Sequence, residues 1–129
     1  MCEHGFDQFV TFVRVKDLGV SRCFYEDVLK LPLILDQGTC LIFGITATAF
    51  VGLCAQESAP NPKGVILTLV TDQLKAWHER LSKAGFPPDG EVRYNAQFNI
   101  THFYVKDPNG YDVELQTFHD PSWPQVGPS

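Results

Sequence analysis

This chain of 129 residues lacks several features that would assign a sequence to a class at once. Its four cysteines form no CxxC pair, and no apolar run approaches the ~20 residues that a membrane-spanning helix needs. There is no excess of basic residues: the formal net charge is −5, and lysine and arginine are scattered. We therefore expect neither nucleic acid nor a membrane as a partner.

The cysteine pattern and the start of the chain bear on the cellular compartment. No positively charged segment followed by an apolar one opens the sequence, so we expect a cytoplasmic protein. In that compartment Cys2, Cys23, Cys40 and Cys54 are expected to be free thiols. Cys40 and Cys54 fall on predicted strands, and the sequence leaves open whether either one is reactive.

A hairpin near the C-terminus is the most informative local pattern. Asp107-Pro108-Asn109-Gly110 is strong turn chemistry, and the flanking segments 101–105 and 112–118 are rich in strand-forming residues. On the second strand Val113 and Leu115 alternate with Glu114 and Gln116. One face is therefore apolar, whereas the other carries an acid and an amide, which favours the lining of a cleft over a dry core.

The two halves of the chain resemble each other. Residues 9–15 and 64–70 are predicted strands, and each is followed by an aspartate, Asp17 or Asp72, placed to begin a helix. Apolar residues at helical spacing then run to Leu31 and Phe86. Further strands follow each helix, predicted at 40–45 and 49–54 in the first half and at 91–94, 101–105 and 112–118 in the second.

This order predicts two tandem βαβββ modules in an α+β protein. We expect a curved, mixed or antiparallel sheet around a cup, with the helices on its outer face and ligand on the concave face. The hydrophobic content of 44% suits one domain of residues 1–129. Within it we place module one at about 6–56, a linker at 57–63, module two at 64–119 and an irregular tail at 120–129.

These motifs resemble the vicinal oxygen chelate superfamily, which includes glyoxalase I, bleomycin-resistance proteins, fosfomycin-resistance enzymes and extradiol dioxygenases. The resemblance rests on residues 13–18 and 24–29, on Val70-Thr71-Asp72, and on the hairpin that leads into Glu114. It implies the same fold but not one activity. In the subclass of bleomycin-resistance proteins it also implies a homodimer with ligand between two chains.

The resemblance implies a metal site in many members, held by a His or Gln on the first strand of each module and by later glutamates. Counting seven residues back from Asp17 and Asp72 places Val10 and Val65 at the first-strand positions, and neither can bind a metal. Glu114 is the one matching ligand, and no carboxylate occurs between Ala49 and Cys54. We therefore expect no metal site of the usual kind.

The alternation of strand side chains predicts the residues that line the cup. If Val10 points inward, Phe12 and Arg14 do so as well, and by the same count Leu67 and Leu69 lie inside with Val65. The last hairpin contributes the polar wall. Its members are His102, Tyr104, Glu114 and Gln116, and Tyr104 lies where extradiol dioxygenases carry an active-site tyrosine.

Three functions remain open. The first is a metal-free protein that binds an aromatic or amphipathic small molecule. The second is a lyase, isomerase or dioxygenase that uses Glu114 with Tyr104 or His102, with or without a nonstandard site for Zn, Mn, Fe or Ni. The third is a scaffold whose cup is filled by Phe12, Leu67 and Leu69. Glu114 itself fits a ligand anchor, a general base or a salt bridge to Arg14, and His102 also fits a purely structural role.

Overall fold

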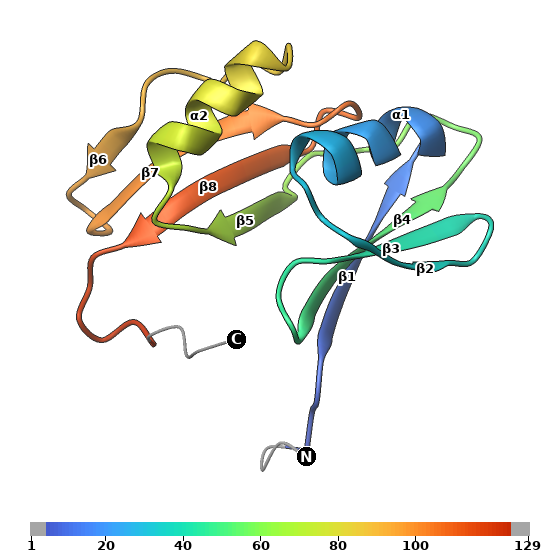
Figure 1. The fold of residues 1–129 in the computed structure, drawn as a ribbon, viewed down its shortest axis with the longest axis horizontal. Coiled ribbons are helices and arrows are strands. Elements are labelled where there is room, and N and C mark those ends of the chain that lie inside the picture. Colours follow the sequence, from blue (N-terminus) through green and yellow to red (C-terminus); the bar gives the residue numbers. More distant parts are fainter. Residues whose placement is uncertain (1–4, 125–129) are drawn as a thin grey trace. The chain divides into compact units, whose positions relative to one another are not determined.

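The computed structural model describes residues 5–124, which divide into two compact units with a boundary between Asn61 and Pro62. Each unit contains a four-stranded mixed sheet, in the orders β1-β4-β3-β2 and β5-β8-β7-β6. The α+β class and the two βαβββ modules are confirmed, with the difference that the strands form two sheets (Figure 1). No helix among residues 5–124 is long and apolar enough to cross a membrane.

The first unit begins with strand β1 (Phe9–Val15), helix α1 (Leu18–Arg22) and a π-helical continuation, η1 (Cys23–Val28). Strands β2 (Leu33–Asp36), β3 (Cys40–Gly44) and β4 (Ala49–Ala55) follow. β1 pairs in parallel with β4, and the other pairs are antiparallel. The residue pattern predicted β3 and β4 but not β2, a short and largely exposed strand directly after Pro32.

Alternate residues of β1 meet the helical layer of the first unit. Val13 and Val15 are buried, whereas Val10, Phe12 and Arg14 are exposed on the opposite face. The predicted alternation along β1 is therefore confirmed. The rest of this core is aromatic and aliphatic, and consists of Phe24, Tyr25, Leu41, Phe43, Val51 and Leu53.

The second unit contains β5 (Ile66–Val70), α2 (Leu74–Lys83), β6 (Arg93–Asn95), β7 (Ile100–Lys106) and β8 (Asp112–Phe118). Helix α2 packs on one face of this sheet (Figure 1). On that face His78 meets the ring of Phe103 edge-on at 5.0 Å. The helix ends before Gly85, whose φ of +89° suits glycine, and Phe86 N–H bonds back to Leu81 O. The predicted extension to Phe86 was therefore slightly too long.

The two helices begin differently, which corrects one prediction. Asp17 caps α1, because its Oδ1 accepts from Val20 N–H at 3.0 Å. Asp72 does not cap α2: its Oδ1 accepts from the side chain of Gln73. The N-cap of α2 is Gln73, which makes no side-chain cap hydrogen bond, and its backbone N–H donates to Thr71 Oγ1 at 3.0 Å. The position that corresponds to Asp17 is therefore Gln73.

The expectation of free thiols is wrong for two of the four cysteines. Cys40 and Cys54 form a disulfide between β3 and β4. They lie directly opposite each other in the antiparallel ladder, with their Cα atoms 4.2 Å apart. Sequence spacing did not show this pairing, because it arises from the register of two strands. Cys23 is an exposed free thiol, and Cys2 lies outside the described residues.

Candidate functional site

The turn between β7 and β8 sets the register of the candidate site. Asp107 Oδ1 accepts from the backbone N–H groups of Asn109 and Tyr111, at 2.8 and 2.9 Å. Gly110 adopts a φ of +88°, as the turn chemistry predicts. The two strands are thereby aligned so that Tyr104 lies opposite Glu114.

Glu114 lies at the centre of a buried polar cluster. It is 7% exposed, and its Oε2 lies 2.8 Å from Nδ1 of His102. Its Oε1 accepts from Thr68 Oγ1 at 2.9 Å. In the amide orientation that satisfies its neighbours, Gln116 donates to both carboxylate oxygens, at 3.1 and 2.9 Å. Both oxygens of Glu114 are therefore occupied by protein donors.

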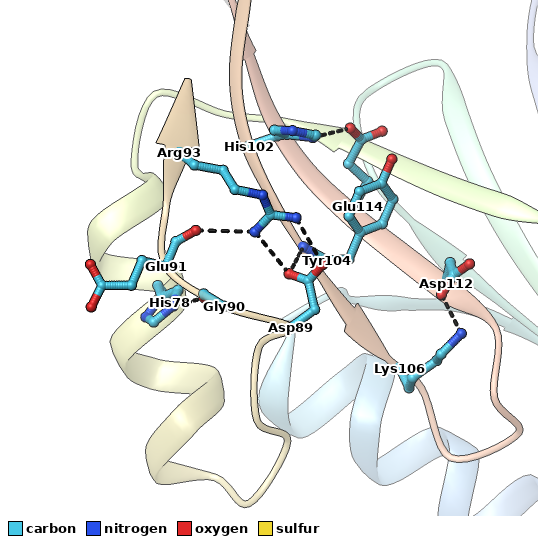
Figure 2. Close-up of polar contacts among 10 residues, drawn as sticks. All are labelled: His78, Asp89, Gly90, Glu91, Arg93, His102, Tyr104, Lys106, Asp112 and Glu114. Atoms are coloured by element: carbon cyan, nitrogen blue, oxygen red, sulfur yellow. Dashed lines mark hydrogen bonds and ion pairs between the residues drawn. The ribbon is translucent and has the colours of Figure 1, made fainter. Parts of the chain in front are cut away.

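Tyr104 extends this cluster along β7. Its ring meets that of His102 edge-on at 5.5 Å, and Figure 2 shows both side chains beside Glu114. Burial raises the pKa of Tyr104 above its usual 10.0, and the charge of Glu114 and a hydrogen bond with it add to the effect. The hydroxyl therefore keeps its proton at neutral pH, donates it to Glu114, and can accept a hydrogen bond from a ligand.

His102 has one ring nitrogen engaged and one available. A carboxylate only accepts hydrogen bonds, so Nδ1 carries the proton in the contact with Glu114. Nε2 has no hydrogen-bond partner among residues 5–124, and no buried side-chain nitrogen or oxygen in that range is unsatisfied. Nε2 is therefore accessible, and in this tautomer it can accept a proton or a hydrogen bond from a ligand.

The structure corrects the predicted lining from β5. Thr68 pairs with Glu114, whereas Leu67 and Leu69 pair with Val113 and Leu115 on the opposite, helix-covered face. Leu67 and Leu69 therefore do not lie on the Glu114 face. The error follows from taking Asp72 as the counterpart of Asp17, which shifted the count by one residue and reversed every side chain of the strand.

The same shift changes the residue at one family metal position. Counted seven residues back from Gln73, the counterpart of Val10 is Ile66 rather than Val65, and neither Ile66 nor Val65 can bind a metal. On β4 the counterpart of Glu114 is Gly52, because Gly52 pairs with Phe12 and Glu114 pairs with Thr68, each five residues before the N-cap of its helix. Within residues 5–124 no group of three or more His, Cys, Asp or Glu side chains is placed to hold a metal ion. The donor set therefore does not fit the metal site of the family.

The remaining predicted lining residues, Phe12 and Arg14, belong to the first unit. They lie on the face of β1 opposite the helices, with Gly52 and Cys54 as their register partners on β4. Phe12 is 55% exposed. Contact of either residue with a ligand, and a salt bridge between Arg14 and Glu114, stay predictions.

An open cleft of about 450 Å³ lies beside Tyr104 in the second unit. Its lining is formed by Ile66, Pro87, Asp89, Tyr104, Val105, Lys106 and Asp112. Asp89 pairs with Arg93 at 2.8 Å and also accepts from the backbone N–H of Tyr104 at 2.9 Å, which ties the wall to β7 (Figure 2). The side chains of Lys106 and Asp112 form an ion pair at 2.5 Å.

Sequence reasoning missed Asp89 and Thr68 as members of the site. Asp89 belongs to a Pro-Pro-Asp-Gly stretch that indicates only a turn. Thr68 is the polar residue in the run Ile66-Leu67-Thr68-Leu69-Val70, and that break in an apolar strand was the available signal. By contrast, His102, Tyr104, Glu114 and Gln116 were placed on one face, and the structure brings them together.

The fold and this hairpin define a protein of two βαβββ modules with a polar cluster on the last two strands. The sequence profile of the Glyoxalase/Bleomycin resistance protein/Dioxygenase superfamily matches residues 5–115. The chain therefore belongs to that superfamily. A comparison with curated protein sequences gives no significant match.

Several solved structures share this fold. A glyoxalase/bleomycin resistance protein/dioxygenase from Nocardioides has a TM-score of 0.75 at 15% identity, over 98% of this chain and 93% of its own. An integron cassette protein from the mobile metagenome of a Halifax Harbour sewage outfall has a TM-score of 0.74 at 19% identity, over 86% and 97%. Lactoylglutathione lyase from Agrobacterium tumefaciens has a TM-score of 0.69 at 20% identity, over 84% and 91%. At these identities the likeness concerns the fold alone.

Proposed function

We propose that this protein binds an aromatic or amphipathic small molecule on the Glu114 face of the second unit, without a divalent metal. Tyr104 connects the buried cluster to the cleft, whose apolar members Ile66 and Pro87 offer contact area. Nε2 of His102 and the Tyr104 hydroxyl are the polar groups that orient the ligand. An apolar cleft with a few convergent polar groups is typical of small-molecule sites.

The observation that carries this proposal is the occupancy of the Glu114 carboxylate. Thr68, His102 and Gln116 supply donors to both of its oxygens. A carboxylate in that state positions its neighbours, whereas a metal would have to displace them and would find no further ligands at Val10 and Ile66. Glu114 therefore acts as the support of the ligand-binding groups.

The metal-free part is tested by elemental analysis of protein purified without added metal. Calorimetric titrations with zinc, manganese, iron(II) and nickel accompany it. We expect less than stoichiometric metal and no tight binding, and the same behaviour for Glu114→Ala. Tight binding of one equivalent that is lost in Glu114→Ala would contradict the proposal.

The ligand-binding part is tested with a panel of aromatic acids, amines and phenols, read out by calorimetry. Tyr104→Ala should weaken any hit at least tenfold, because it removes a wall of the cleft and a hydroxyl that can bond to the ligand. The matched control is Tyr94→Ala, an exposed tyrosine on β6 of the same sheet, which should leave the affinity unchanged. Equal losses in both variants would place the ligand elsewhere.

A second candidate function is acid–base catalysis, in a lyase or isomerase. It is favoured by the contact between His102 Nδ1 and Glu114, which leaves Nε2 free to move a proton. His102→Gln should then abolish turnover of a substrate from the panel while the melting temperature changes little. If turnover survives in His102→Gln, the histidine is not the base. A dioxygenase reaction would also need the metal tested above.

We further propose that the protein is a homodimer in a cytoplasmic setting. Support for the dimer comes from large apolar side chains that are exposed in the single chain, including Phe6 at 81% and Phe9 at 68%. The superfamily resemblance points in the same direction. The net charge of −5 suits a small-molecule partner better than nucleic acid.

A further inference from the structure

The disulfide of the first unit joins two cysteines that its sheet already holds together. Cys40 and Cys54 are the first of five register pairs that run along β3 and β4 to the pair of Gly44 and Phe50. Fourteen positions separate the two cysteines in the sequence, and 4.2 Å separate their Cα atoms.

The ladder between β3 and β4 has support that does not depend on the disulfide. On the helix-covered face Leu41 lies opposite Leu53, and Phe43 lies opposite Val51, and all four are buried. Burial of these side chains stabilises the strand pair in either redox state. Reduction would therefore leave two thiols facing each other in an unchanged sheet, ready to close again.

The surroundings of the pair distinguish its two sulfur atoms. Both cysteines lie on the face opposite the helices, and Arg14 of β1 is the register partner of Cys54 on that face. A neighbouring guanidinium favours the thiolate form of a cysteine. Cys54 is only 6% exposed, whereas Cys40 is half-buried, so an incoming reagent reaches Cys40 more easily.

We propose that Cys40 and Cys54 form a reversible dithiol–disulfide site that exchanges with low-molecular-weight disulfides such as glutathione disulfide. Cys40 thiolate attacks one sulfur of glutathione disulfide, forms a mixed disulfide and releases one glutathione thiolate. Cys54 thiolate then attacks the Cys40 sulfur and releases the second glutathione. The protein pair loses two electrons and two protons, which the two glutathione molecules gain.

This site is independent of the proposed ligand site, which lies in the second unit. It adds a redox-controlled modification to the face of the first unit that carries Phe12 and Arg14. The exchange differs from a structural disulfide in one respect: both states keep the same fold and interconvert without unfolding.

The first experiment uses full-length protein with Cys2→Ser and Cys23→Ser, so that only the pair can react. The protein is equilibrated in glutathione buffers of increasing oxidised fraction, quenched with acid and assayed for thiols. We expect a change from two thiols to none in a single two-electron step, identical from either direction, with an unchanged near-ultraviolet circular dichroism spectrum. Unfolding of the reduced protein, or a disulfide that resists excess dithiothreitol in the folded protein, would overturn the proposal.

The second experiment tests the order of attack in the same background. With glutathione disulfide, Cys54→Ser should accumulate a stable mixed disulfide on Cys40, detected by intact mass as one added glutathione. Cys40→Ser should react at least tenfold more slowly, because Cys54 is buried. Equal or reversed rates would overturn the assigned order, and no adduct on Cys54→Ser would overturn exchange at this site.

Discussion

At the scale of single residues, the ring of Phe12 lies against the backbone of Gly52 on the neighbouring strand. A Cβ atom at position 52 would stand 2.4 Å from Cδ1 and 2.5 Å from Cε1 of that ring. Gly52→Ala should therefore lower the free energy of unfolding by about 1–3 kcal/mol, because the ring must leave its position. Urea denaturation of the variant and the parent protein measures the difference.

Phe12→Ala, alone and combined with Gly52→Ala, tests whether the ring of Phe12 causes this loss of stability. Phe12 is 55% exposed, so Phe12→Ala alone should cost much less than a core substitution. In the double variant the clash is absent, and the two effects should not add. Additive losses would show that Gly52 is needed for another reason.

At the scale of secondary-structure elements, we expect the neighbouring residues Thr71 and Asp72, which precede α2, to differ in their contribution to stability. Thr71→Ala removes the acceptor for the backbone N–H of Gln73 in the turn before α2 and should cost about 1 kcal/mol, and Asp17→Ala removes the cap of α1 at a similar cost of about 1 kcal/mol. Asp72→Ala is the matched control and should change stability by less than about 0.5 kcal/mol, because Asp72 accepts only from the exposed side chain of Gln73. Chemical denaturation gives all three values, and a larger loss for Asp72→Ala than for Thr71→Ala would contradict this prediction.

Asp89, in the loop after α2, predicts how the stability of the protein changes with pH. The hydrogen bond from Arg93 lowers the pKa of Asp89 below its usual 3.8, against an opposing effect of burial, and the Tyr104 backbone N–H adds to the lowering. Because the folded pKa is the lower one, this stabilisation is present above pH 3.8 and is lost as the pH falls through the folded value.

Asp89→Asn should therefore flatten the decline of stability below about pH 4. The side chains of Asp89 and Arg93 are both 42% exposed, so the effect should be modest. Melting temperatures between pH 2.5 and 6 provide the measurement, and Glu91→Gln in the same loop is the control. A decline of the same steepness in Asp89→Asn and the parent protein would rule out this role.

At the scale of the whole molecule, the exposed phenylalanines of the first unit predict self-association. Sedimentation equilibrium should give about twice the chain mass of 14.5 kDa. Phe9→Ser should shift the equilibrium toward the monomer, whereas Leu35→Ser, at a residue of β2 that is 49% exposed, serves as the control. A monomer at all concentrations would contradict the proposed homodimer.

What the sequence by itself determined about this protein is local. The turn chemistry of Asp107 to Gly110 and the alternation along the hairpin predicted the strands and placed His102, Tyr104 and Glu114 on one face. Helical spacing and repeated order predicted two βαβββ modules, and hence the α+β class. Each of these inferences depends on residues that are near one another in the chain.

Only the tertiary structure decided which distant residues meet. Thr68 rather than Leu67 lies beside Glu114, and Cys40 faces Cys54, because the register between strands sets both contacts. A shift of one residue exchanges the two faces of a strand, and no local pattern detects that shift. The family scaffold was therefore readable from the sequence, whereas the contact of Thr68 with Glu114 and the Cys40–Cys54 disulfide were not.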